Sequence, residues 1–322
     1  MPTRIEISHK TIFFTFGFLA FVWFLWQIKE IILVLFLAFI LMSALRPSVE
    51  KLEKFRIPRI ISILFIYFLF LFFLGAVGGA IFPPLILQTL RFWERLPEFF
   101  AKILPFLPLN FEFLTQQLTP VGGNILRITL GFFSNVFTLV TFLVLSFYLL
   151  LERSNLESAF KTLFGEESGE KVVKIIWKIE ERLGAWIRGQ VILMLVVGLA
   201  AFIGLTGLGV DYALPLALTA GIFEIIPIAG PILAGIPAVL VALVTSPVLA
   251  LAVVALYFII QQLENNLIVP TVMRKAVGLP PFITLLALMI GGKLAGIFGA
   301  FLAVPTVVIL QTILVEIASQ RK

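Results

Sequence analysis

The sequence predicts an all-α polytopic membrane protein, with about six full spans and two re-entrant helical hairpins that form a C-terminal inverted repeat. Of the 322 residues, 61% are hydrophobic and only 13% are charged, and the mean hydropathy is +1.12. Soluble domains are about 45–50% apolar and about 25% charged, so a soluble fold could not bury this much apolar surface. The apolar residues form long runs, typical of membrane helices, rather than the roughly ten-residue alternation of a membrane barrel.

Residues 1–151 form the predicted N-terminal membrane region, which holds four spans. Apolar runs at 12–28 and 31–45 are separated by only two charges, Lys29 and Glu30. We favour two spans joined by a tight turn over one bent helix, because the two runs together are far longer than one bilayer crossing. No small-residue cleavage site follows the first run, so it is interpreted as a retained span and not as a signal peptide.

The short loop at 46–59 orients the chain, because it carries five cations. The positive-inside rule places this loop and both termini in the cytoplasm. The third and fourth spans are predicted at 60–82 and 128–151, with an external amphipathic segment at 85–127 between them. The five cations are Arg46, Lys51, Lys54, Arg56 and Arg59.

Residues 152–188 are predicted to form a cytoplasmic amphipathic linker helix. They hold seven cations and seven glutamates, and apolar residues recur between these charges at helical spacing. Such a helix lies at the membrane interface. Two interpretations stay open: a solvated helix on the membrane surface, or a mobile linker that couples two membrane halves.

Residues 189–322 form the predicted transport region. A span at 191–205 precedes a hairpin whose short arms meet at a break rich in proline and glycine, and a span at 248–267 precedes a second hairpin of the same kind. Proline removes a backbone donor and glycine permits sharp turns, and irregular backbone at membrane depth is tolerated only where protein or a wet cavity satisfies it. The predicted tip residues are Pro227, Gly230 and Pro231 in the first hairpin, and Gly292 and Gly296 in the second.

The distribution of charge gives the two hairpins opposite orientations, the first entering from outside and the second from the cytoplasm. A span and a hairpin, repeated with opposite orientation, is the inverted-repeat plan of secondary transporters, in which both tips reach a common midplane site. The alternative is that these segments are ordinary kinked spans.

Three ionisable groups lie deep in the apolar sequence of this region: Glu224, Glu264 and Lys293. A carboxylate at the centre of a membrane helix costs about 2.5–3.5 kcal/mol on insertion scales, so it is rarely present without a function. Glu264 is the first candidate, because it can exchange a proton and is expected to face both hairpin tips. The alternative is a structural glutamate bonded to a neighbouring helix. Amides that suit a cation or a polar solute surround it: Gln261, Gln262, Asn265 and Asn266.

The other candidates lie near the predicted membrane interfaces or tips. Glu224 precedes Pro227 and is either a site or gate residue or an interfacial one. For Lys293 three roles stay open: it could neutralise a glutamate, bind an anionic group or extend to the surface. Arg188 and Gln190 begin the fifth span at the cytoplasmic interface, as interfacial anchors or as site residues.

Several classes of chemistry are excluded. The chain has no cysteine, which excludes disulfides, thiol catalysis and cysteine-ligated metals, and its single histidine, His9, lies in the polar N-terminal tail. It has no nucleotide-binding phosphate loop, no metal-ligand spacing and no nucleophile–histidine arrangement. We therefore expect no enzyme activity, no cofactor, no metal site and no nucleic-acid partner, with transport driven by an ion or solute gradient.

Five short motifs, in order along nearly the whole chain, resemble the autoinducer-2 exporter family, also known as the PerM-like permeases. One departure is visible, since the loop after the Glu-Asn span commonly carries a His-Pro pair in this family and here reads Leu279-Pro-Pro281. Any proton role of that histidine cannot apply. The motifs are Arg56-Ile-Pro-Arg59, Arg188-Gly-Gln190, Ile226-Pro-Ile-Ala-Gly-Pro231, Glu264-Asn265 with Pro270, and Gly296 to Ala303-Val-Pro305.

The resemblance implies an inner-membrane permease with cytoplasmic termini that assembles as a homo-oligomer. It also implies either export of a small polar solute such as autoinducer-2 or exchange of Na⁺ or Li⁺ against protons. Exporter is the leading expectation, Na⁺(Li⁺)/H⁺ antiporter the alternative, and a non-transporting membrane scaffold the second alternative. The expected partners are the lipid bilayer and the transported solute, Na⁺ or H⁺.

Overall fold

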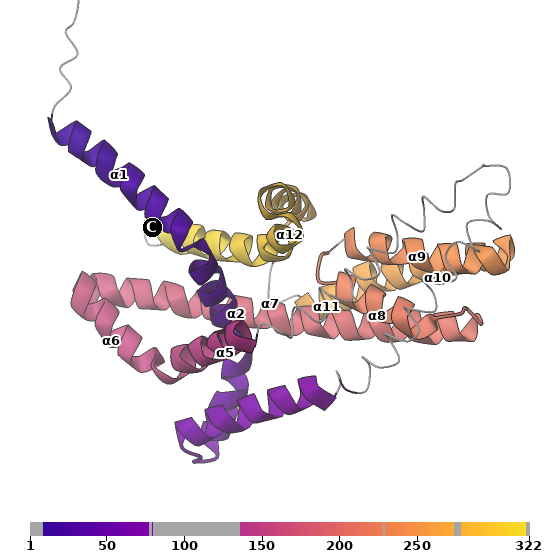
Figure 1. The fold of residues 1–322 in the computed structure, drawn as a ribbon. Helices are drawn as coiled ribbons and strands as arrows, with labels where there is room; N and C mark the ends of the chain where they lie inside the picture. Colours follow the sequence, from indigo (N-terminus) through magenta and orange to yellow (C-terminus); the bar gives the residue numbers. More distant parts are fainter. Residues whose placement is uncertain (1–8, 77–78, 80–135, 228, 274–277, 320–322) are drawn as a thin grey trace, which may run out of the picture.

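The computed structural model describes residues 9–76, 79, 136–227, 229–273 and 278–319, and every element in these ranges is a helix (Figure 1). The predicted all-helical class is therefore confirmed for the described part of the chain. The predicted external segment at 85–127 lies outside the described residues. Within them, five helices are long and apolar enough to cross a membrane, or six if the bent pair α5 and α6 counts as one span.

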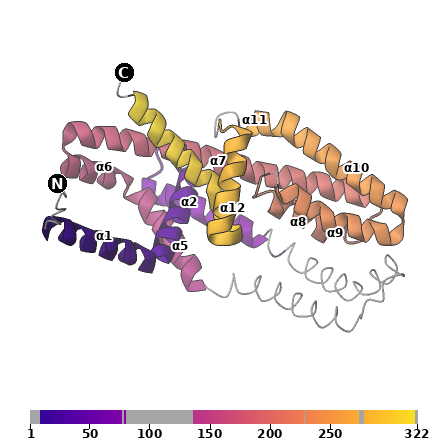
Figure 2. The same cartoon turned by 90° about the horizontal axis from the view of Figure 1, so that it is seen from above.

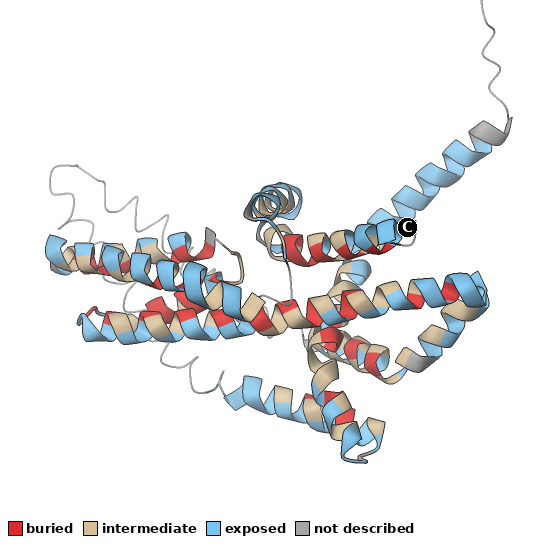
Figure 3. Ribbon diagram, turned by 180° about the vertical axis from the view of Figure 1, so that it is seen from behind, coloured by how far each residue is buried: buried red, intermediate tan, exposed pale blue. Residues whose placement is uncertain are grey.

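The N-terminal half begins with α1 (His9–Gln27) and α2 (Lys29–Lys54), which are separated by Ile28. They are two helices that meet end to end at an angle (Figures 1 and 2). The 26-residue α2 is a candidate span, whereas the described apolar part of α1 belongs to the shorter helices. All of its residues from 13 to 27 are exposed (Figure 3), which suits contact with lipid.

Three helices of this half share a small core. The helix Arg59–Ala76 and α5 (Val136–Leu151) pack against α2 around a buried apolar cluster. Tyr67 Oη donates a hydrogen bond of 2.5 Å to Ser146 Oγ across the pair. Interhelical hydrogen bonds of this kind contribute to association where lipid removes the hydrophobic driving force.

The long helix α7 (Glu166–Gly207) organises the molecule. It follows the short α6 (Arg153–Phe164) and runs for 42 residues, so it is about 63 Å long, roughly twice the hydrocarbon thickness of a bilayer. The predicted linker at 152–188 and the predicted span at 191–205 are therefore parts of one rod beyond Gly165. Gly189 does not interrupt it, because a glycine inside a helix costs only about 1 kcal/mol.

The remaining helices belong to the C-terminal half. They are α8 (Ala213–Phe223), α9 (Ala229–Thr245), α10 (Pro247–Leu263), a π-helix (Glu264–Ile268), α11 (Val269–Met273) and α12 (Pro281–Ser319). Figures 1 and 2 show α7 running past both groups of helices, with α2 and α6 along its first part and α8, α9 and α10 along its second part.

Small residues let α8 approach α7 closely. A Cβ added to Gly221 of α8 would lie 2.8 Å from the carbonyl oxygen of Met194, and one added to Gly198 of α7 would lie 3.4 Å from Gly221 Cα. Backbone contact through glycine is a common way for membrane helices to pack. This contact fixes the end of α8, and with it Glu224, beside the middle of α7.

The helix α12 consists of two arms joined at a sharp kink. Ala295 and Gly296 have non-helical backbone angles, and Gly296, at φ 59° and ψ −140°, occupies a region that only glycine adopts readily. The arms then pack backbone to backbone, because a Cβ on Gly291 would lie 2.2 Å from the carbonyl oxygen of Gly299. The kink coincides with the break that the sequence predicts at Gly292 and Gly296.

Candidate functional site

Glu224 ends α8 and is 1% exposed. Its backbone carbonyl accepts a hydrogen bond of 2.6 Å from Nε2 of Gln190, a buried residue of α7. The carbonyls at the end of a helix have no partner within it, so the glutamine supplies one that buried backbone requires. Oε2 of Glu224 has no donor among the described residues.

Glu264 is 4% exposed and begins the π-helix that follows α10. Its Oε2 accepts a hydrogen bond of 3.2 Å from Gln261 Nε2, and its backbone carbonyl accepts from the N–H of Val269, five residues later. Pro270 has no N–H for the carbonyl four residues before it, so the regular helical ladder cannot continue there. Single π-turns of this kind are frequent at functional sites.

The side chains of Glu224 and Glu264 line the same cavity and lie close enough for their charges to interact. The ion pairs of the described residues include neither carboxyl group. Two adjacent ionised carboxylates repel, so the pair is stable when a proton or another cation lies between them. The fold thus brings the two acidic residues singled out in the sequence to one place.

A cavity of about 300 Å³ adjoins the acid pair. Its polar lining consists of Gln190, Glu224, Glu264 and Thr284. The rest is apolar and comes from α7, the α8–α9 turn, α11, the segment just before α12 and the second arm of α12. A concave, mostly apolar site with a few convergent polar groups is typical of small-molecule binding.

The lining also includes residues that the sequence did not single out as site residues. Trp186 of α7 is 1% exposed, and its ring centroid lies 6.4 Å from that of Phe301 in α12. Met273, Thr284 and Val304 complete the wall on the side of α11 and α12. Of these, only Trp186 stood out in the sequence, because it belongs to the apolar residues that recur at helical spacing in the linker segment.

The other predicted residues lie at different distances from this cavity. Pro227 is part of its lining. Asn265 and Asn266 are exposed, and Asn266 Nδ2 donates to the Gln262 carbonyl at 2.8 Å. Lys293 is exposed beside the kink of α12, away from the cavity lining. The two arms of α12 reach the cavity through residues far from their kink.

The tip of the first hairpin forms a tight turn and borders a second groove. A Cβ on Gly230 would lie 1.9 Å from the carbonyl oxygen of Phe223, so only glycine fits this turn. Pro231 lines a groove of about 450 Å³ between α9 and α10, together with Tyr257 and Gln261. Since Gln261 also donates to Glu264, it stands between this groove and the acid pair.

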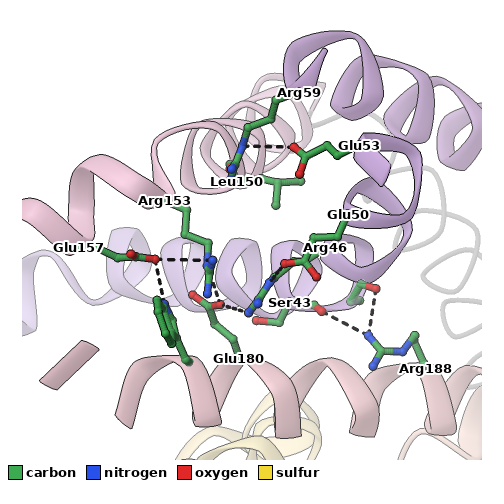
Figure 4. Close-up of polar contacts among 12 residues, drawn as sticks. Ser43, Arg46, Glu50, Glu53, Arg59, Leu150, Arg153, Glu157, Glu180 and Arg188 are labelled. Carbon is green, nitrogen blue, oxygen red and sulfur yellow. Dashed lines mark hydrogen bonds and ion pairs between the residues drawn. The ribbon is translucent and has the colours of Figure 1, made fainter. Parts of the chain in front are cut away.

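Arg188 lies at a crossing of α2 and α7 (Figure 4). Its Nη1 donates to the backbone carbonyls of Ser43 and Ala44 at 3.3 and 3.2 Å. Pro47, four residues after Ser43, has no N–H to satisfy the first of these. A Cβ on Gly184 would lie 2.1 Å from the Ser43 oxygen, so the two backbones touch.

Charged residues of α7 join it to the other helices. Glu180, 3% exposed, accepts from Arg46 of α2 at 2.5 Å and from Arg153 of α6 at 3.0 Å (Figure 4). On another side, Lys178 pairs with Glu316 of α12 at 2.5 Å. The rod that carries Gln190 and Trp186 is therefore held by both halves of the chain.

Comparisons with known proteins agree with the sequence resemblance. A family model described as "AI-2E family transporter" matches residues 12–319. "Putative transport protein YueF" of Bacillus subtilis (strain 168) is 31% identical over 224 residues, 70% of this chain and 58% of that protein. "Putative permease PerM" of Escherichia coli (strain K12) is 27% identical over 210 residues, 63% of this chain and 59% of that protein. In both cases the chain spans less than two-thirds of the relative's own length.

Proposed function

Because the chain belongs to the AI-2E transporter family, we propose that it is a secondary transporter that moves a small solute through the cavity beside Glu224 and Glu264, in exchange for protons. The observation that carries this proposal is the buried acid pair on the wall of a cavity. A proton and a cationic or hydrogen-bonding solute compete for the same carboxyl oxygens, and this competition couples their movements.

The proposed cycle uses the two hairpins as the moving parts. The turn between α8 and α9 carries Glu224 and Pro227, and α12 carries Thr284 and Val304, so a movement of either hairpin changes access to the acid pair. The opposed membrane orientation of these hairpins, and with it the inverted repeat, is part of the proposal. The inner-membrane location, the cytoplasmic termini and a homo-oligomeric assembly belong to it as well.

The family resemblance suggests two kinds of solute, and the site offers support for each. Export of a small polar solute such as autoinducer-2 is supported by a cavity that has room for an organic molecule. Na⁺(Li⁺)/H⁺ antiport is supported by the acid pair, since carboxylate and amide oxygens are ligands for hard cations. A scaffold has no use for a buried acid pair beside a cavity, because such groups are costly in a membrane.

Transport by purified protein in proteoliposomes tests the proposal. Wild-type protein should couple solute movement to a pH change inside the vesicles, and Glu264→Gln and Glu224→Gln should abolish this coupling. Glu167→Gln is the matched control, because Glu167 is an exposed residue of α7 that pairs only with Lys171 among the described residues. Coupling that survives both site substitutions would refute the proposal.

The same assay separates the two solutes. Proton movement driven by Na⁺ or Li⁺, and lost in Glu264→Gln, would identify the antiporter. Movement of a labelled polar solute without any Na⁺-driven pH change would identify the exporter.

A further inference from the structure

The cavity presents hydrogen-bond acceptors that lack donors. Oε2 of Glu224 and Oε1 of Gln190 are both buried and have no hydrogen-bond partner among the described residues. The orientation of the glutamine amide is fixed, because its Nε2 must point toward the Glu224 carbonyl, 2.6 Å away, and an oxygen in that place would face another acceptor. A buried acceptor without a donor is destabilising, so a ligand that donates hydrogen bonds would suit these atoms.

The described lining carries two carboxyl groups. Glu224 and Glu264 both border the cavity, and no lysine, arginine or histidine is found among its described lining residues. Buried carboxylates require a cationic partner or a proton. Once the pair has released its proton, an anionic solute would be repelled here, and a neutral polyol would leave the carboxylate without a cationic partner.

The remaining walls are apolar, which a bare metal ion would not need. They include Trp186, Leu193, Met273 and Val304. A cavity of about 300 Å³ is at the lower end of the range of small-molecule sites, about 300–1,000 Å³. The face of an indole ring such as that of Trp186 also attracts organic cations.

From these three features we infer that the solute is a small organic ammonium ion with an apolar body, and this inference rests on the proposed transport function. An ammonium nitrogen has up to three N–H donors and no acceptor, which matches acceptors from Gln190, Glu224 and Glu264. Its hydrocarbon part occupies the apolar walls. The solute binds when the pair releases a proton and leaves when a proton returns, so one cation replaces another and the charge of the site is conserved.

Binding to purified full-length protein in detergent tests the charge requirement. The probes are n-butylammonium, n-butanol and butyrate, which share one hydrocarbon chain and differ in charge, together with NaCl. Calorimetric titration should show saturable binding of butylammonium, weaker at lower pH, and at least roughly ten-fold weaker binding of the other three probes, the size expected for a charge-assisted hydrogen bond.

Isosteric variants locate the binding to this cavity. Glu264→Gln should abolish butylammonium binding, and Gln190→Met should weaken it roughly ten-fold. Glu167→Gln should leave it unchanged, and a melting temperature for each variant shows that it is folded. Equal binding of butanol and butylammonium, tight binding of Na⁺ that excludes butylammonium, or full binding by folded Glu264→Gln would each overturn the inference.

The proteoliposome assay separates this inference from the proposed function. If Glu264-dependent proton coupling occurs with Na⁺ or a neutral polyol and butylammonium does not bind, transport stands and the ammonium inference fails. If butylammonium does not bind and no solute gives Glu264-dependent coupling, both fail.

Discussion

Arg188 of α7 donates a hydrogen bond to the backbone carbonyl of Ser43 in α2, at the point where these helices touch. The carbonyl is available because Pro47 has no N–H to donate to it. The proline in one half and the arginine in the other are therefore two parts of a single contact. We expect the contact to be detectable as an energetic coupling between residues 47 and 188.

A double-mutant cycle measures this coupling. Arg188→Ala should destabilise the protein by about 1–3 kcal/mol, because it leaves a buried carbonyl without a donor. Pro47→Ala restores the N–H, so Arg188→Ala should cost less in that background. Thermal unfolding in detergent of the four proteins gives the comparison, and equal costs in both backgrounds would show that the two residues do not interact.

Glu180 is expected to be the most sensitive residue of the junction between α2, α6 and α7. It is 3% exposed and accepts from both Arg46 and Arg153, so Glu180→Gln leaves two cations without their shared partner. Arg46 and Arg153 are partly exposed and each keeps a second carboxylate partner, so this loss should cost about 1–3 kcal/mol. Glu50→Gln removes the more exposed partner of Arg46 and should cost less than about 1 kcal/mol. Similar melting temperatures for the two variants would contradict this ranking.

Adjacent glycines in α12 provide a matched test of the hairpin. A Cβ at position 291 would lie 2.2 Å from the Gly299 carbonyl oxygen, whereas a Cβ at 292 meets no atom within 4 Å. Gly291→Ala should therefore lower both the melting temperature and transport. Gly292→Ala should leave the protein unchanged or raise its stability by about 0.5–1 kcal/mol, because alanine favours the helix. If both substitutions are tolerated equally, the two arms do not pack as described.

Cysteine labelling tests the proposed opposed orientation of the hairpins, and the native chain is suitable because it has no cysteine. Ala229→Cys, at the first hairpin, should react with an impermeant maleimide only from outside. Ala295→Cys, at the kink of α12, should react only from the cytoplasmic side. Labelling of both positions from one side would rule out the inverted repeat.

Local features of the fold were predictable because they depend on short stretches of sequence. Apolar run lengths indicate the helices, and the break at Gly296 follows from a residue type that tolerates a positive φ. The continuity of α7 was harder to predict, because the sequence changes from charged to apolar near Gly189 while the backbone continues as helix. Composition reports the environment of a helix and not where the helix ends.

The candidate site was predictable residue by residue but not as an arrangement. Glu224 and Glu264 stand out as charges in apolar sequence, and each lies in the structure at an irregular point of the backbone. Their meeting depends on the packing of Gly221 against α7 and on the π-turn before Pro270, which are tertiary properties. For the same reason the sequence left open whether Lys293 contacts a glutamate or extends to the surface, and in the structure it is exposed beside the kink.

The central claim is that the pair of Glu224 and Glu264 exchanges a proton for the solute. Proton release on solute binding measures this most directly, using purified protein in weakly buffered detergent solution with a pH-sensitive dye. Wild-type protein and Glu167→Gln should release protons when the solute is added, and Glu224→Gln and Glu264→Gln should release none. Solute binding without proton release in the wild type, or unchanged release in both site variants, would contradict the claim.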